Sequence, residues 1–185
     1  MTRDRRSLAR APWQTISTRC VYTNPWMRVR EDIAEMPDGR RTIYGVVESK
    51  PAVGVLPFLD RDTVVLVGQY RYVARDFFWE IPTGAIGAGE SETDAAQREL
   101  AEEAGYRAGR LAKLCTFHTS KSVVEEIAHI YVAEALTPVE HDADDTEFIE
   151  VGRFAFADVV KMVERCEIMD AMTVVAVLHW ARRAG

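Results

Sequence analysis

Three carboxylates crowd one turn of a segment with helical character. Glu99 and Glu103 are four residues apart and Glu102 is three from Glu99, so on an α-helix all three lie on one face. Like charges at this spacing repel, at a cost of roughly 0.2–0.5 kcal/mol per pair. Two interpretations follow: a solvated acidic face, the commoner case for such a triple, or a site where a bound cation reverses the repulsion.

A glycine-rich loop precedes these carboxylates and favours the second interpretation. Gly84, Gly87 and Gly89 allow the chain to pass close to the helix, and Glu90 adds another carboxylate. Backbone carbonyls of the loop could join the carboxylates as ligands, and Thr83, directly before Gly84, is included as a candidate ligand. Oxygen-only ligation suits Mg²⁺ or Mn²⁺, and the chain offers no Cys/His grouping for zinc.

The spacing of this segment resembles the Nudix box, G-x5-E-x7-R-E-U-x-E-E-x-G-U, where U is a bulky aliphatic residue. The match runs through Gly84, Glu90, Arg98, Glu99, Leu100, Glu102, Glu103 and Gly105. Only the last position departs from the motif, with Tyr106 in place of an aliphatic residue. At about one chance in fifteen for each specified residue, such a match arises on the order of once in 10⁸ starts, which removes the solvated face as the better explanation.

The resemblance implies a metal-dependent hydrolase. It makes Glu99 and Glu103 the main metal ligands, with Glu102 assisting or holding a water bound to the metal. Glu90 and Arg98 become a supporting pair, and we rank Arg98 as structural because a guanidinium among carboxylates restrains the loop against the helix. Two or more Mg²⁺ ions, with Mn²⁺ as a substitute, would neutralise and orient a diphosphate and lower the pKa of the attacking water.

Residues upstream of the box resemble the ADP-ribose pyrophosphatase branch of the Nudix family, through GQYRYV (68–73) and FWEIPTGAI (78–86). This similarity implies cleavage of ADP-ribose, a nucleoside diphosphate sugar, to AMP and ribose 5-phosphate. Arg71 suits a phosphate or the adenine ring, and Glu80 can accept hydrogen bonds from base or ribose. The alternative for both is an ion pair at a strand edge.

One departure leaves the substrate open. The branch commonly carries a serine-proline-glycine segment after the box, whereas this chain has HTSKSVVEE (118–126). Glu126 occupies roughly the place of an acidic residue found there in relatives, although an exposed strand start explains it equally well. NADH, GDP-mannose and UDP-glucose therefore stay as alternative substrates, and a nucleotide-sugar sensor without catalysis stays as a different class of protein.

The general base is expected in an acidic loop. In this branch such a loop closes over the metals and offers a carboxylate to the attacking water. Here the loop is EHDADDTEFIEV (140–151), and Glu147 is the first candidate because it directly precedes an expected strand, with Asp145 second. A merely solvated acidic loop is the alternative.

The elements that must position these groups follow from apolar periodicity and turn residues. A hairpin is predicted around Pro37-Asp38-Gly39, between 26–34 and 42–48. Further predicted elements are strands at 52–59, 63–73, 77–82, 111–118, 126–136 and 148–154, and helices at 95–104, 157–165 and 170–182. We expect Tyr70 and Trp79 to be core aromatics. The order predicts an α/β fold, a mixed sheet with helices on both faces, and the resemblance specifies a Nudix-type α/β/α sandwich with an added N-terminal antiparallel sheet.

Composition bounds the remaining possibilities. A chain of 185 residues favours one domain, with strands in 1–50 used in dimerisation and a catalytic core in 51–185. The net charge of −6 argues against a nucleic-acid partner. No apolar run reaches the ~18 residues that span a bilayer, so we expect no membrane partner, and three scattered cysteines suit a cytoplasmic protein. The resemblance implies a homodimer.

Overall fold

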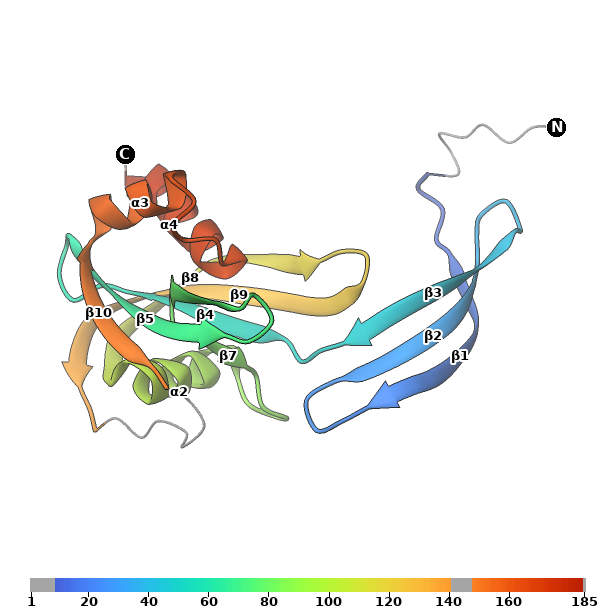
Figure 1. The fold of residues 1–185 in the computed structure, drawn as a ribbon, viewed down its shortest axis with the longest axis horizontal. Helices are drawn as coiled ribbons and strands as arrows, with labels where there is room; N and C mark the ends of the chain where they lie inside the picture. The colour runs from blue at the N-terminus through green and yellow to red at the C-terminus, as the bar shows by residue number, and fades with distance from the viewer. Residues whose placement is uncertain (1–8, 141–147, 185) are drawn as a thin grey trace. The chain divides into compact units, whose positions relative to one another are not determined.

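The computed structural model describes residues 9–140 and 148–184, and the chain divides into two units (Figure 1). The N-terminal unit contains the residues up to Ser49 together with 120–126. The main unit contains 50–119 and the residues from Ile127 onward.

Three antiparallel strands in sequence order form the N-terminal unit: β1 (Gln14–Thr23), β2 (Arg28–Glu35) and β3 (Arg41–Glu48). The predicted hairpin is confirmed, and Gly39 in its turn has φ 86°, a left-handed conformation that favours glycine. The end of β3 also pairs in parallel with Val124 and Glu125. The sequence analysis missed β1, because every residue of that strand is exposed and no burial alternation marks it.

A charged network lies in the N-terminal unit. Arg30 contacts Asp32 at 3.0 Å, Glu48 at 2.7 Å and Glu125 at 2.9 Å. Asp32 is only 6% exposed and also accepts a hydrogen bond from Thr18, which lowers the pKa of the Asp32 carboxyl. A buried carboxylate is tolerated here because it is both paired and hydrogen-bonded.

The main unit contains the remaining strands. They are β4 (Ala52–Pro57), β5 (Thr63–Arg71), β6 (Asp76–Glu80), β7 (Thr83–Ala85), β8 (Tyr106–Ser120), β9 (Val124–Pro138) and β10 (Glu150–Ala155). β4 pairs in parallel with β9 and antiparallel with β7, while β5 lies between β10 and β6 with both pairings antiparallel. The predicted mixed sheet is confirmed.

Helices cover both faces of these strands (Figure 1). On β4, Val53 and Val55 pack with α2 (Glu92–Ala104), while Leu56 packs in a second cluster with α3 (Phe156–Glu164) and α4 (Ala171–Ala184). The period-2 alternation of strand side chains explains how one strand serves two cores. The predicted α/β/α sandwich is therefore confirmed.

The boundaries differ from expectation mainly in the long hairpin strands. β8 and β9, which pair with each other, extend beyond the predicted 111–118 and 126–136 into partly exposed residues. The short strand β7 was not predicted, and residues 141–147 of the expected acidic loop lie outside the described residues. No described helix is both long enough and apolar enough to cross a bilayer.

Candidate active site

Capping residues fix both ends of α2. The Ser91 hydroxyl accepts the Asp94 backbone N–H at 3.1 Å and donates to the Asp94 carboxylate at 2.7 Å. At the other end Gly105 adopts φ 71°, and its N–H bonds to the Ala101 carbonyl at 3.1 Å. Since Leu100 is fully buried, the rotation of the helix is set as well as its ends.

The acidic turn of α2 is pressed against the loop that precedes the helix. Glu99 and Glu103 are only 8% and 3% exposed. A Cβ atom added at Gly84 would lie 1.9 Å from Glu99 Oε1, so any larger residue would force this carboxylate out of its position. The Thr83 backbone N–H donates to Glu103 Oε2 at 2.8 Å. β7 holds the loop in place through the Val53–Gly84 pairing with β4.

Arg98 joins the loop to the helix electrostatically. Its guanidinium bonds Glu90 at 2.9 and 3.0 Å, Glu99 at 2.7 Å and Glu102 at 3.0 Å, and it also donates to the Ala85 carbonyl at 3.0 Å. These carboxylates raise the pKa of Arg98, with Glu90 contributing most. Arg98 therefore offsets part of the repulsion that the sequence places on this turn.

Glu90 is the most strongly held of the carboxylates contacting Arg98. Its hydrogen bonds from Arg98, together with the Gly87 backbone N–H at 2.7 Å, lower its pKa from 4.5 to about 2. Burial opposes this shift but does not cancel it. Glu90 consequently stays ionised well below neutral pH, and its negative charge remains in place beside the loop.

The donor chemistry of this region fits a hard divalent cation. Glu99, Glu102 and Glu103 offer only oxygen, and the Gly84 loop passes against Glu99. Among the described residues, no three acidic, His or Cys side chains already enclose a point where a metal ion would sit, since Arg98 binds two of the three glutamates. Uptake of a cation therefore requires these side chains to adjust around Arg98.

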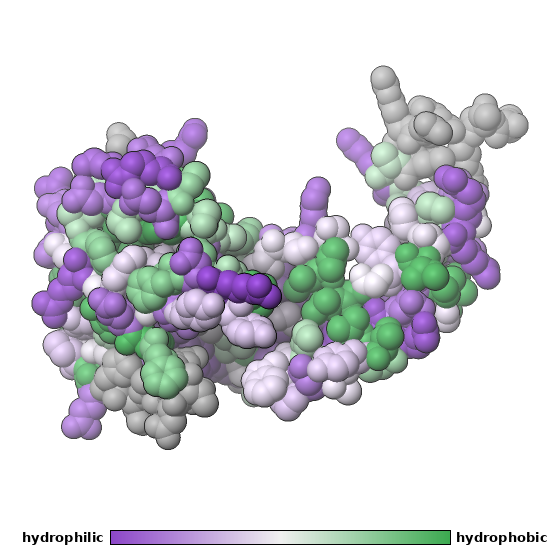
Figure 2. All heavy atoms as spheres, viewed as in Figure 1, coloured by the Kyte–Doolittle hydropathy of each residue, from purple (hydrophilic) through white to green (hydrophobic). Residues whose placement is uncertain are grey.

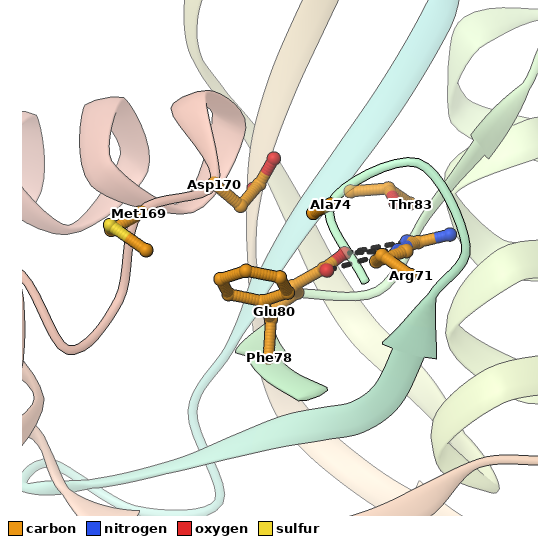
Figure 3. Close-up of a pocket in the computed structure, with 7 residues that line it drawn as sticks. All are labelled: Arg71, Ala74, Phe78, Glu80, Thr83, Met169 and Asp170. Atoms are coloured by element: carbon orange, nitrogen blue, oxygen red, sulfur yellow. Dashed lines mark hydrogen bonds and ion pairs between the residues drawn. The ribbon is translucent and has the colours of Figure 1, made fainter. Parts of the chain in front are cut away.

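A pocket of about 440 Å³ opens beside the acidic turn (Figure 3). Its lining comes from the end of β5, the β5–β6 turn, β6, the start of β7 and the segment leading into α4. It comprises Arg71, Ala74, Phe78, Glu80, Thr83, Met169 and Asp170. Thr83 belongs to both regions, because its backbone N–H bonds to Glu103. Thr83 thus links the pocket directly to a carboxylate of α2 through one hydrogen bond.

Arg71 and Glu80 form an ion pair inside this pocket. The guanidinium reaches both carboxylate oxygens, at 2.5 to 3.1 Å, and the Glu80 side chain is only 5% exposed. Glu80 is the largest cause of a raised Arg71 pKa, with smaller contributions from Glu103 and Asp170. The ion pair that was the alternative to ligand binding is present, and it lies in a pocket, where it can also serve a ligand.

The remaining predicted site residues are Glu126, Asp145 and Glu147. Glu126 belongs to the N-terminal unit, where it accepts a hydrogen bond from Ser49 at 3.0 Å. Asp145 and Glu147 lie outside the described residues. Trp79 packs against the core as expected, but Tyr70 is 61% exposed, so the expectation that it is a core aromatic is wrong. Tyr70 lies near the end of β5, beyond the buried part of that strand.

Sequence reasoning missed four residues of the pocket. Phe78 was assigned only to a strand and Asp170 only to a helix start, while Ala74 and Met169 were assigned to no element. Asp170 could have been recognised as a helix N-cap, but no local pattern places it beside Arg71, which is far away in the sequence. Only the packing of α4 on the sheet brings them together.

Comparison with protein families divides the chain at nearly the same place as the structure does. The NUDIX domain matches residues 48–170, and the nucleoside diphosphate sugar hydrolase N-terminal domain matches residues 13–47. The chain is 33% identical over 168 residues to an ADP-ribose pyrophosphatase of Bacillus subtilis, covering 90% of this chain and 91% of the relative. It is 31% identical, with the same coverage, to a methanol dehydrogenase activator of Bacillus methanolicus.

A solved structure shows the same architecture. The crystal structure of an ADP compounds hydrolase superimposes with a TM-score of 0.83 at 25% sequence identity, covering 95% of this chain and 97% of that one. The similarity therefore extends over both units and not only over the acidic helix.

Replacing Gly84 with alanine is expected to damage the acidic turn. The new methyl group would collide with the Glu99 carboxylate, so we expect unfolding to become easier by about 1–3 kcal/mol and Mn²⁺ binding to weaken by ~10-fold or more. Urea unfolding and calorimetric titration with Mn²⁺ measure the two effects. Gly45→Ala is the matched control, because a Cβ there meets nothing within 4 Å. Wild-type stability and affinity in Gly84→Ala would contradict this packing.

The low pKa of Glu90 predicts a pH-dependent contribution to stability. A carboxyl whose pKa falls from 4.5 to about 2 on folding stabilises the fold fully above about pH 4.5, and that contribution disappears as the pH falls toward 2. The difference in unfolding free energy between wild type and Glu90→Gln should therefore shrink over this range. Urea unfolding at pH 7, 4.5 and 3 measures it, and a difference that is constant across the three pH values would rule out the proposed linkage.

Proposed function

Because the chain belongs to the Nudix hydrolase family, we propose that it hydrolyses the pyrophosphate bond of ADP-ribose and releases AMP and ribose 5-phosphate. The observation that carries this proposal is the continuity at Thr83 between the α2 carboxylates and a pocket large enough for part of a nucleotide. The relatives named for ADP-ribose support the choice of substrate.

We propose that Glu99 and Glu103 hold Mg²⁺, or Mn²⁺ in its place, with Glu102 and Thr83 completing the protein ligands. When bound, the ions supply positive charge to the diphosphate and lower the pKa of the attacking water. Glu90 and Arg98 hold the loop against the helix while the ligands rearrange. The fold supports this division of roles, because Glu90 is the carboxylate that both Arg98 and the loop backbone bind.

In the proposed reaction a water oxygen attacks one phosphorus atom and the bridging P–O bond breaks. Glu102, with a side chain 41% exposed, orients the water, and Glu147, or Asp145 in its place, accepts the proton. Arg71 and Glu80 bind the nucleotide in the pocket, and Glu126 stays a proposed substrate-binding residue. The free thiols of Cys20, Cys115 and Cys166 support a cytoplasmic enzyme, and the net charge of −6 argues against nucleic acid as a partner.

Loss of a proposed metal ligand should remove most of the activity. With Mg²⁺ present, Glu103→Gln is expected to lower kcat for ADP-ribose by ~100-fold, while Glu164→Gln, an exposed glutamate on α3, should leave it unchanged. Phosphate release after phosphatase treatment measures turnover, and excess chelator should abolish it. Full turnover in Glu103→Gln would remove this mechanism.

The same assay ranks the substrates. ADP-ribose is expected to exceed NADH, GDP-mannose and UDP-glucose in kcat/KM. A different leading substrate would keep the reaction class and change the assignment, whereas tight binding without turnover of any of them would indicate a sensor.

We propose further that the protein is a homodimer formed through the N-terminal unit. This unit exposes large aliphatic and aromatic side chains, and Figure 2 shows green, hydrophobic surface over part of it. They are Trp13, Ile16, Val21, Tyr22, Trp26, Met27, Ile43, Tyr44 and Val123. An apolar surface of this kind on so small a unit is typical of a surface that another chain covers.

Light scattering tests the dimer. The expected mass is twice the 20.9 kDa of the chain, and Ile43→Asp, at a side chain 63% exposed, should shift the protein toward monomer. Val73→Asp places the same charge on a 93% exposed aliphatic side chain of the main unit and should leave the mass unchanged. A wild-type monomer at working concentration would contradict the proposal.

A further inference from the structure

The pocket beside Arg71 contains an acidic residue to which neither the motif nor the proposed reaction gives a role. Asp170 lies on the segment leading into α4, across the pocket from Glu80 (Figure 3). Phe78, Met169 and Ala74 contribute apolar surface to the same pocket. A flat ring with a polar edge suits such walls better than a sugar, which carries hydroxyl groups all round.

The orientation of Asp170 is fixed by a hydrogen-bonded relay. Its Oδ2 atom accepts the Thr173 backbone N–H at 2.8 Å and the Thr173 hydroxyl at 2.7 Å. The Thr173 side chain is fully buried, and its hydroxyl oxygen accepts the Ile81 backbone N–H at 3.0 Å. Because Ile81 directly follows Glu80, this relay ties Asp170 to the strand that carries Glu80.

Asp170 keeps one oxygen for a ligand. Both hydrogen bonds to its carboxylate use Oδ2, and no hydrogen bond from a described residue reaches Oδ1. Glu80 differs, since both of its oxygens accept from Arg71. Asp170 thus presents to the pocket a carboxylate oxygen that is held in place and has no donor function.

We infer that Asp170 accepts a hydrogen bond from the exocyclic amino group of the nucleobase and so selects a 6-amino purine over a 6-oxo purine. This inference rests on the proposed function, because it names the part of the substrate that the pocket reads. An amino group donates to Oδ1, whereas a carbonyl oxygen at the same position meets it lone pair to lone pair. Phe78 stacks on the base that Asp170 reads.

Substrate discrimination tests the inference. Wild type should prefer ADP-ribose over its inosine counterpart, IDP-ribose, by ~10-fold or more in kcat/KM, the scale of one hydrogen bond to a charged group. Asp170→Asn should bring the ratio close to one, because an amide can donate as well as accept. Asparagine is also a good N-cap, so α4 should keep its start and the melting temperature should stay near that of wild type.

The control is Asp158→Asn, which removes an exposed carboxylate from α3 and should keep the wild-type ratio. A wild-type ratio near one would overturn the inference without any variant. So would equal losses on both substrates in Asp170→Asn, since Asp170 would then read a group that they share, such as a ribose hydroxyl.

Binding without turnover separates this inference from the proposed reaction. Calorimetric titrations with AMP and IMP in the presence of chelator should show the same preference for the amino base in wild type and its loss in Asp170→Asn. If wild type binds AMP over IMP but does not hydrolyse ADP-ribose, the proposed reaction fails while the role of Asp170 is supported. Equal binding of AMP and IMP by wild type would overturn the inference.

Discussion

The close approach of the acidic turn of α2 to the Gly84 loop is the constraint on which the rest of the site depends. Carboxylates that are nearly buried cost several kcal/mol unless hydrogen bonds and opposite charge compensate them. Here the loop supplies backbone N–H groups and Arg98 supplies the charge. The same contacts hold the loop in place, so they both position the acidic groups and compensate their charge. Replacing Gly84 would disturb the position and the charge compensation together.

Two acidic groups of different character meet at Thr83. On the α2 side, glutamates share one guanidinium and present oxygens of the kind that hard cations bind. On the pocket side, Glu80 is neutralised by Arg71, and Asp170 is held by Thr173. The first group suits a diphosphate together with its cations, and the second suits an organic group that offers hydrogen bonds. This ordering along one surface supports the cleavage of a nucleotide at its phosphates.

The parts of the fold that local spacing determines were predictable from the sequence. The capping residues Ser91 and Gly105 gave the position of α2, and Gly39 gave the hairpin of the N-terminal unit. The strand β1 was not predictable, because its residues are all exposed and lack alternation.

Within the candidate site, the positions of the glutamates and Arg98 follow from helical spacing, whereas the position of Asp170 does not. Its place beside Arg71 depends on how α4 packs against the sheet, and no local pattern records that packing.

The α2 motif is local in sequence, whereas the pocket is assembled from distant residues, and this difference bears on why similar chains carry different names. The α2 segment is local, so a chain can keep the reaction class by keeping a short motif and the glycine that accommodates it. The proposed binding of the organic group uses instead residues such as Arg71, Glu80 and Asp170, which come from separate elements and can change one at a time. Relatives at nearly equal identity are named for ADP-ribose cleavage and for activation of a dehydrogenase. A change at the pocket would leave the charge compensation around Arg98 intact.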